Sequence, residues 1–343
     1  MFFNTIKTHT LNLITQAAVR QNLTTRPRVI LGLSGGPDSL FLFHVLKDLH
    51  AQEKIELIAA HLDHGWRAES GNDVTFCREL CARYNIPFVS AKADTLAITI
   101  KSNGSQEEIG RKLRRFFFEQ TRTAHDGHFI ALAHHQDDQQ ETFFMRLCRG
   151  TSLAGLHGMN EIEPPSLLAT ARQVGPYLRP LLGISKKEIV QFLDENKHTY
   201  LVDSTNQSDN YLRNKIRKYV IPALQACDKR FDNNFATTIE KLKEEDELLK
   251  RLTQQAFHEI FSYDQPFGIH KGNLAKLQNL DPILQRRVIL HWLVAEQIPF
   301  TPSAGFINEI VRFLASREGG KHALGTHWSL NKKQQVVWLE KEI

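Results

Sequence analysis

The chain has 343 residues, 41% of them apolar, and a formal net charge of +5. This length suits two or three domains with a sizeable core rather than one typical domain. No apolar stretch approaches the roughly 20 residues of a membrane helix, and the first residues lack a signal-peptide pattern, so we expect a soluble, cytoplasmic protein without membrane contact. Its four cysteines form no C-x-x-C pair or metal-ligand spacing, which indicates free thiols in a reducing compartment.

Apolar runs and helical patterns alternate along the first two hundred residues. Strands are predicted at residues 28–33, 55–62, 87–90 and 128–133. Helices are predicted at residues 39–50, 70–84, 105–123 and 137–148. This alternation predicts an α/β fold, a parallel sheet covered by helices on both faces. Such a sheet binds its ligands beyond the carboxyl ends of the strands.

The pattern changes after Pro222, where helical periodicity dominates. The helices expected there cover residues 231–261, 281–296 and 303–315. Residues 322–330 and 335–339 flank Asn331, Lys332 and Lys333 as in a β-hairpin. We therefore divide the chain into an α/β domain at 1–215, a mostly helical domain at 216–318 and a short β-hairpin tail at 319–343.

A glycine-containing loop joins the first predicted strand to the first helix after it. Its residues are Ser34, Gly35, Gly36, Pro37, Asp38 and Ser39. Two glycines let the backbone approach an anion, and the following helix contributes the positive end of its dipole. The loop matches neither G-x-x-x-x-G-K-[ST] nor G-x-G-x-x-G. An ordinary Gly-Pro turn is the alternative to a nucleotide-binding loop.

Polar side chains follow two further predicted strands. Asp63, His64 and Arg67 come after the second strand, either as a turn leading to a helix cap or within reach of a bound nucleotide or substrate. The fourth strand is followed by His134, His135, Gln136, Asp137, Asp138 and Glu141.

This second group of polar residues admits three interpretations: a dimetal hydrolase site, a capped helix start, or a Mg²⁺ site. Mg²⁺ takes one or two carboxylates together with phosphate oxygens. Beside a triphosphate, Asp38 and Asp137 are therefore the candidate metal ligands.

Basic residues crowd two stretches of the chain. They are Arg111, Lys112, Arg114, Arg115 and Arg122 in the first, and Arg213, Lys215, Arg217 and Lys218 in the second. Such stripes can follow a nucleic-acid backbone, although each alone could be a solvated helix face with salt bridges.

The loop at residues 34–39 resembles the pyrophosphate loop, S-G-G-x-D-S, of the ATP pyrophosphatase superfamily. Further blocks in the same order are similar to those of the tRNA(Ile)-lysidine synthetase family: D-H-G-W-R-A-E-S from Asp63, G-R-K-L-R-R-F from Gly110, A-H-H-Q-D-D-Q-Q-E-T from Ala133, R-G-T from Arg149, L-R-P-L-L from Leu178 and D-S-T-N from Asp203, the last followed by Arg213, Asn214 and Arg217. The resemblance spans residues 28–224 and is weak beyond them.

The resemblance implies a PP-loop fold, like that of the adenine nucleotide α-hydrolases, and an ATP- and Mg²⁺-dependent ligase. The family joins free lysine to C2 of the wobble cytidine in an isoleucine tRNA with a CAU anticodon. The cytosine carbonyl oxygen attacks the α-phosphorus of ATP and releases pyrophosphate; the lysine ε-amine then attacks C2 and expels AMP. The α/β domain would bind ATP and carry the chemistry, and the helical domain would bind tRNA.

The resemblance and the motifs together give a set of candidate site residues. Residues 34–39 would hold ATP, Asp38 and Asp137 the metal, and Asp38, Asp137 and Glu141 would act in catalysis. Contacts to substrate or tRNA are expected from Asp63, His64, Arg67, Arg111, Arg114, Arg115, His134, Asp138, Arg149, Arg213, Asn214 and Arg217. The lysine ε-amine titrates near 10.4, so an acidic group must bind the cation and take its proton, and Asp137, Asp138 and Glu141 are the candidates.

Two other functions compete with this one. A tRNA thiolase of the same superfamily would share the ATP loop but needs a cysteine to carry sulfur or hold a cluster. A non-catalytic RNA-binding protein would explain the basic stretches but would leave the loop and the His/Asp group without a task. The sequence leaves open whether the chain forms a homodimer.

Overall fold

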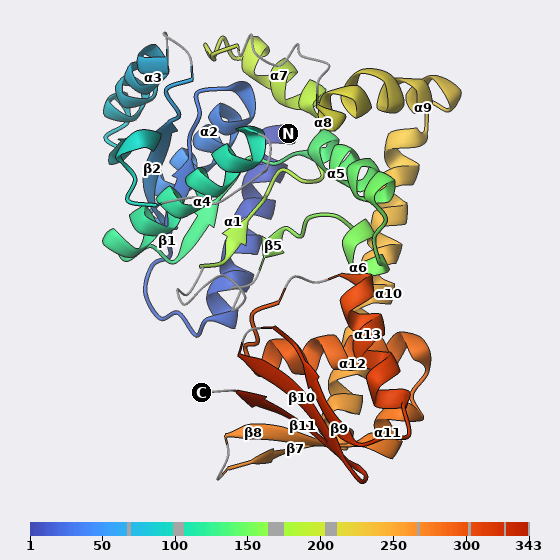
Figure 1. Ribbon diagram of the computed structural model, residues 1–343. Coiled ribbons are helices and arrows are strands. Elements are labelled where there is room, and N and C mark those ends of the chain that lie inside the picture. The colour runs from blue at the N-terminus through green and yellow to red at the C-terminus, as the bar shows by residue number, and fades with distance from the viewer. Residues whose placement is uncertain are drawn as a thin grey trace. The chain divides into compact units, whose positions relative to one another are not determined.

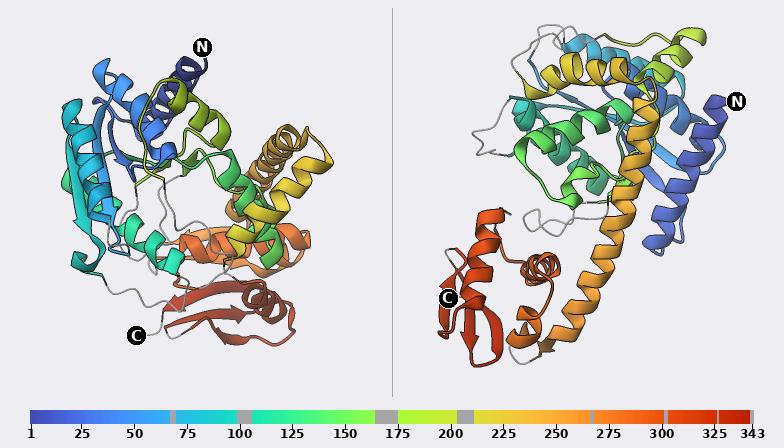
Figure 2. Two further views of the ribbon diagram at one scale, coloured as in Figure 1. Left: turned by 90° about the horizontal axis from the view of Figure 1, so that it is seen from above. Right: turned by 90° about the vertical axis from the view of Figure 1, so that its right-hand side faces the viewer.

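The computed structural model describes residues 1–66, 70–98, 106–163, 175–202, 211–265, 268–300, 303–325 and 327–341 (Figure 1). These form two compact units, the first ending at Ile239 and the second beginning at Glu240. The division falls within helix α10 (Phe231–Ile260), which Figure 2 shows as one uninterrupted helix. Within these ranges, no helix combines the length and apolarity that crossing a membrane requires.

The first unit contains a six-stranded sheet in the order β3-β2-β1-β4-β6-β5. Its strands are β1 (Arg28–Gly32), β2 (Glu56–Asp63), β3 (Phe88–Lys92), β4 (Phe129–Ala131), β5 (Ile162–Glu163) and β6 (Tyr177–Leu178). All pair in parallel except β5, which runs antiparallel to β6. The predicted α/β fold with a parallel sheet is confirmed. Because the chain crosses from β3 back to β4 on the far side of β1, the carboxyl ends of β1 and β4 flank the point where ligands bind in such sheets.

Helices cover both faces of this sheet because its strands are apolar on both sides. Val29 and Leu31 of β1 are buried in the core under one layer of helices, whereas Ile30 faces Phe117 and Phe118 on the other side. The first layer consists of α1 (Phe2–Arg20), α2 (Pro37–Ala51), α3 (Ser70–Arg83) and α7 (Lys186–Glu195); α4 (Gln106–Ala124) covers the opposite face.

Further helices precede α10 among the described residues of the first unit. They are α5 (Gln136–Arg149), the four-residue helices α6 (Leu153–Leu156) and α8 (Leu212–Lys215), and α9 (Ile221–Cys227). α8 and the π-helical turn Ile216–Val220 pack on α5, where Arg213 and Arg217 both contact Glu141. These contacts place the segment around residue 215, where the domain boundary was predicted, inside the first unit, which ends at Ile239.

The second unit combines helices with a five-stranded antiparallel sheet in the order β7-β8-β11-β10-β9. Its elements after α10 are β7 (Phe261–Asp264), β8 (Ile269–Asn273), α11 (Leu274–Gln278), α12 (Pro282–Ala295), α13 (Ala304–Ala315), β9 (Gly320–Ala323), β10 (Trp328–Lys333) and β11 (Val336–Lys341). The core gathers around Trp292, Leu330 and Leu339.

The predicted tail hairpin corresponds to β10 and β11, but these strands belong to the larger sheet. β9 pairs with β10, and β8 pairs with β11, so strands on both sides extend the hairpin. The sequence did not indicate β7 and β8, because β8 reads Ile-His-Lys-Gly-Asn and lacks the alternation of apolar residues that marks a strand.

Candidate functional site

The loop of residues 34–39, called the phosphate loop below, connects β1 to α2 and is closed by its own serine hydroxyls. The backbone N–H of Ser34 donates to Ser39 Oγ over 3.1 Å, and Ser39 Oγ donates to the Gly36 carbonyl over 3.0 Å. The two hydroxyl oxygens of Ser34 and Ser39 lie 3.0 Å apart. Gly36 precedes the helix and Pro37 begins it, so the positive end of the α2 dipole faces the loop.

Gly35 occupies a backbone conformation that other residues adopt at a cost. Its φ is +82°, and a Cβ there would lie 2.6 Å from Leu201 Cδ1. The Gly35 carbonyl accepts a hydrogen bond from the Leu201 backbone N–H over 2.9 Å, so the segment after α7 is in direct contact with the loop. A glycine is therefore required at this position.

A cavity of about 280 Å³ opens beside the phosphate loop. The described residues that line it are Gly32, Leu33, Ser34, Asp38, Ser39, His61, Leu62, His64, Arg111, Arg114, Arg115, Phe118, Leu132, Ala133, His134, Arg179 and Arg213. These come from the ends of β1, β2, β4 and β6, from the loop, from α4 and from α8, and the strand ends meet where the strand order of the sheet reverses.

Five arginines line this cavity, and we call them the arginine wall: Arg111, Arg114, Arg115, Arg179 and Arg213. Partial desolvation and the charges of Arg115, Arg213 and Arg179 lower the pKa of Arg111. Glu163 contacts Arg115 and Arg179 and compensates part of this charge. A cluster of like charges of this kind attracts an anionic ligand.

Arg179, which is 2% exposed, fixes the imidazole of His134. Arg179 Nε donates to His134 Nδ1 over 3.1 Å, so Nδ1 is an acceptor and the proton of the neutral ring is on Nε2. Burial, together with the neighbouring arginines, lowers the pKa of His134 to about 3 despite the nearby Asp138. His134 is thus a neutral hydrogen-bond donor at physiological pH.

His135 lies among three carboxylates at the start of α5. Its Nε2 is 3.7 Å from Asp38 Oδ2 and 3.4 Å from Asp138 Oδ2, and its Nδ1 is 3.6 Å from Asp137 Oδ1. Burial by itself lowers the pKa of His135, but the three carboxylates outweigh burial and raise it. The loop after β1 and the loop after β4 therefore bring Asp38 and Asp137 around one imidazole.

Lys186, the first residue of α7, contacts both of these aspartates. Its Nζ donates to the two carboxylate oxygens of Asp38 over 2.7 and 2.6 Å. Its backbone N–H donates to Asp137 Oδ1 over 3.1 Å. Burial raises the pKa of Asp137, but His135 and this backbone N–H outweigh burial, and the pKa is lowered.

Glu141 is buried and paired with two arginines, whereas a general base must be free to accept a proton from the substrate. Its side chain is 1% exposed and accepts hydrogen bonds from Arg213 Nε over 2.7 Å and Arg217 Nε over 2.5 Å. Like Asp137 and Asp138, it is not among the described residues that line the cavity, so its two arginine partners are what distinguish it from them. With both oxygens held by guanidinium groups, Glu141 has the geometry of a support for Arg213.

The remaining predicted site residues are spread more widely. Asp63 is buried and accepts from the Gly65 backbone N–H over 2.8 Å, and His64 lines the cavity. Arg149 is exposed at the end of α5, Asn214 lies in α8, and Arg67 is outside the described residues. Lys186, Arg179 and His61 are site residues that the sequence did not indicate. Arg179 stands in the run Leu178-Arg179-Pro180-Leu181-Leu182, which resembles a block of the family, but no role was predicted for it.

The described residues contain no set of three His, Cys, Asp or Glu side chains arranged to hold a metal by themselves. A dimetal hydrolase site would need such a set. One Mg²⁺ bound jointly by a nucleotide needs only one or two carboxylates, and Asp38 and Asp137 on either side of His135 meet that requirement.

Comparisons with known proteins agree with this architecture. A family model described as a PP-loop domain matches residues 6–224, and one described as a TilS substrate binding domain matches residues 273–338. The chain is 34% identical over 306 residues to the tRNA(Ile)-lysidine synthase of Bacillus subtilis, covering 88% of this chain and 62% of that protein. It is 30% identical over 329 residues to the tRNA(Ile)-lysidine synthase of Haemophilus ducreyi, covering 96% of this chain and 72% of that one. It thus spans less than two thirds of the Bacillus subtilis relative.

A solved structure shares the fold of the chain. The U34-tRNA thiolase NcsA from Methanococcus maripaludis, whose structure holds a 4Fe-4S cluster, superposes with a TM-score of 0.55 at 18% sequence identity. The match covers 70% of this chain and 80% of that one. At this identity the likeness concerns the fold alone.

Proposed function

Because the chain belongs to the tRNA(Ile)-lysidine synthase family of PP-loop proteins, we propose that it uses ATP to join free lysine to C2 of the wobble cytidine in an isoleucine tRNA with a CAU anticodon. The cytosine O2 attacks the α-phosphorus of ATP, and the bond from that phosphorus to the β-phosphate oxygen breaks. The ε-amine then attacks C2, loses a proton and displaces AMP. The place of action is the cytoplasm.

One observation carries this proposal: the phosphate loop and the arginine wall line the same cavity. The loop offers backbone N–H groups and the hydroxyls of Ser34 and Ser39 to the departing pyrophosphate. The arginines of the same cavity offer positive charge to a second phosphorylated substrate. A site for ATP alone would not need five guanidinium groups.

The arginine wall suits an RNA substrate in particular. An unstacked cytosine in an anticodon loop can enter a cavity at modest cost, and the flanking phosphates can pair with arginines of the cavity wall. We assign Arg111, Arg114, Arg115 and Arg213 to these contacts. The neutral His134, with its Nε2–H available, is placed to donate to an acceptor of the base. Phosphate contacts position the RNA, so they do not by themselves select isoleucine tRNA.

Asp38 and Asp137 are the residues that would hold Mg²⁺. When bound, the ion would neutralise charge that develops on the pyrophosphate as it leaves. The chain contributes the positions of the two carboxylates, which His135 and Lys186 hold close together.

The lysine substrate needs a carboxylate that can first bind its ammonium group and then accept a proton. Glu141 is occupied by Arg213 and Arg217, so we assign this role to the aspartates that follow His135. Asp137 is already assigned to Mg²⁺, which leaves Asp138, whose Oδ1 lies 3.5 Å from a nitrogen of the cavity-lining Arg213, for this role.

The thiolase alternative is not favoured. None of the four cysteines is among the described residues that line the cavity. Cys77 and Cys81 are buried, and burial raises the pKa of each thiol to about 12, which keeps them protonated and unreactive. Cys148 and Cys227 are exposed, on α5 and α9.

Product analysis tests the proposal directly. The protein is incubated with ATP, Mg²⁺, labelled lysine and an isoleucine tRNA transcript with a CAU anticodon, and the label is sought in the RNA. We expect incorporation that requires ATP and yields AMP. Incorporation of sulfur from a sulfur donor, with none from lysine, would establish the thiolase instead, and tRNA binding without AMP formation would establish a non-catalytic RNA-binding protein.

The second unit is assigned to tRNA binding as well. Residues 273–338 within it match the substrate binding domain of the family. We propose that this unit contacts parts of the tRNA outside the anticodon. Deleting residues 240–343 should then weaken tRNA binding while ATP binding is retained, which filter binding and ATP titration measure.

A further inference from the structure

The ammonium group of Lys186 has no direct task in the proposed reaction. Its ammonium group lies 2.7 and 2.6 Å from the two oxygens of Asp38, a residue of the phosphate loop. Its backbone N–H binds the other proposed metal ligand, Asp137, over 3.1 Å. A single residue thus contacts both carboxylates that would hold Mg²⁺.

The backbone of Lys186 is fixed, whereas its side chain can turn. Ser185 caps α7, accepting from the Glu188 backbone N–H, and the Glu188 carboxylate accepts from the Ser185 N–H over 2.9 Å in return. α7 also packs against α2, the helix that begins with the phosphate loop. The Lys186 side chain is 37% exposed and carries its charge on a flexible four-carbon chain.

An ammonium group and Mg²⁺ cannot both occupy this position on Asp38. Mg²⁺ binds carboxylate oxygens at about 2.0–2.1 Å, and it would face the Lys186 charge across the same pair of oxygens. The two cations would repel each other strongly at that separation. Binding of Mg²⁺ at Asp38 would therefore displace the ammonium from at least one of these oxygens, and phosphate oxygens of a nucleotide on the loop would be strong acceptors for it.

We propose that Lys186 is a phosphate-binding residue that neutralises Asp38 until Mg²⁺ and ATP arrive, and that its ammonium then turns to the phosphate groups that leave as pyrophosphate. The proposal rests on the use of ATP in the proposed function. It requires that Lys186 lower the affinity for the divalent metal alone and raise the affinity for ATP, so removing its charge should change the two affinities in opposite directions.

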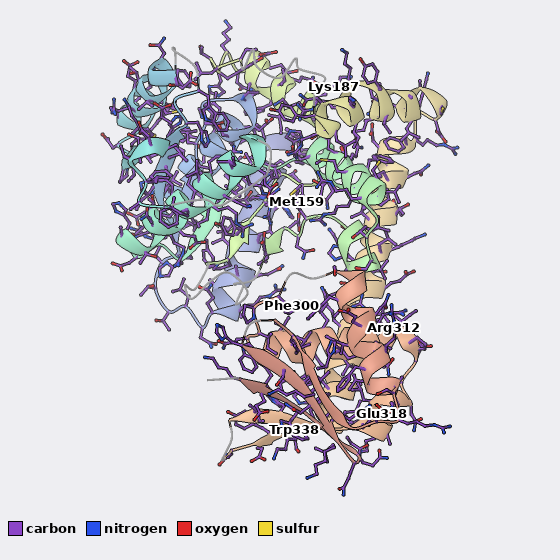
Figure 3. The ribbon with its side chains drawn as sticks, in the orientation of Figure 1. Met159, Lys187, Phe300, Arg312, Glu318 and Trp338 are labelled. Atoms are coloured by element: carbon purple, nitrogen blue, oxygen red, sulfur yellow. The ribbon has the colours of Figure 1, made fainter. Side chains whose placement is uncertain are left out.

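The substitution Lys186→Met tests both signs, because it removes the charge and keeps the length of the side chain. The matched control is Lys187→Met, the next residue on α7, which is exposed and labelled in Figure 3. Binding of Mn²⁺ alone is followed by electron paramagnetic resonance, and binding of ATP in saturating Mg²⁺ by calorimetry. Neither measurement needs tRNA or lysine, so failure of lysine incorporation does not affect them.

For Lys186→Met we expect Mn²⁺ to bind several-fold more tightly than to the unsubstituted protein, and ATP to bind about tenfold more weakly, the usual effect of losing one charged hydrogen bond. Lys186→Arg should retain most of the ATP affinity, and Lys187→Met should change neither constant. Weaker binding of both ligands, or unchanged Mn²⁺ binding, would overturn the proposal. If Lys186→Met does not fold, the same two titrations on Lys186→Gln decide the question.

Discussion

Glu141 Oε2 accepts a hydrogen bond from Arg213 Nε over 2.7 Å, and this contact connects α5 to the arginine wall. The same carboxylate also accepts from Arg217, so one buried negative charge holds two guanidinium groups of the segment after α7. The contact determines where a cavity-lining arginine lies.

Glu141→Gln should reduce the stability of the protein by roughly 2 kcal/mol or more, because it removes the buried partner of two arginines. Arg217 is 45% exposed and recovers part of its hydration, which limits the loss. Urea unfolding measures the change. Glu240→Gln, at a glutamate that is 68% exposed and pairs with Lys243, is the control and should leave the midpoint unchanged. Unaltered stability in Glu141→Gln would contradict the supporting role.

Gly35→Ala and Gly36→Ala should lower the stability of the protein by different amounts, although the two residues are neighbours. Gly35 has a positive φ and its added Cβ would meet Leu201, so alanine there should cost about 1–3 kcal/mol. Gly36 has a φ of −70°, and its Cβ would lie 3.5 Å from Ser34 Oγ, an ordinary contact. Thermal unfolding of the two variants is the measurement. Equal midpoints would show that the loop adapts to a side chain at residue 35.

Asp38→Asn should lower the rate of tRNA-dependent AMP formation by about 100-fold or more and leave tRNA binding nearly intact, since it removes a carboxylate proposed to hold the Mg²⁺ that would neutralise the leaving pyrophosphate. AMP release and filter binding of tRNA give the two readouts. Asp48→Asn, near the other end of α2 where Asp48 pairs with Lys47 on the surface, serves as the control. A full rate in Asp38→Asn would dismiss its metal role.

The stability of the protein should fall in mild acid, and His44 accounts for part of the fall. Burial, followed by the charges of His198 and Lys47, lowers the pKa of His44 to about 3. Above pH 6.5 the folded and unfolded states both hold a neutral imidazole. Below it only the unfolded state gains a proton, so stability is lost as the pH drops from 6.5 towards 3.

Between pH 7 and pH 5 the protonation of His44 in the unfolded state should lower the free energy of unfolding by about 2 kcal/mol. His44→Phe removes the titrating group and retains a ring to stack on His198, 3.8 Å away in the parent protein. Urea unfolding at the two pH values should give a smaller difference for the variant. An identical pH dependence in both proteins would exclude a contribution from His44.

The local pattern of the sequence was sufficient for the first four strands of the parallel sheet and for the strand-loop-helix that holds the phosphate loop, but not for the two-residue strands β5 and β6. Buried parallel strands read as continuous apolar runs, and a loop of this kind uses residues that are adjacent in the chain, so both leave a signal within a few positions. His134 and Asp137 could be placed near that loop because the carboxyl ends of parallel strands meet at one edge. The second sheet was only partly predicted, since β7 and β8 are short and polar and are held by pairing with strands far along the chain.

Only the tertiary structure decided which charge pairs with which. Nothing near Glu141 in the sequence indicates that residues 213 and 217 will neutralise it, and nothing near Asp38 indicates Lys186, 148 positions away. The strength of an ion pair depends on the separation and burial of its two charges in space, and these are fixed when α7 and α8 pack against the sheet and α5. The sequence by itself thus identifies the reactive groups, and folding determines whether each one is free to act or held by a partner.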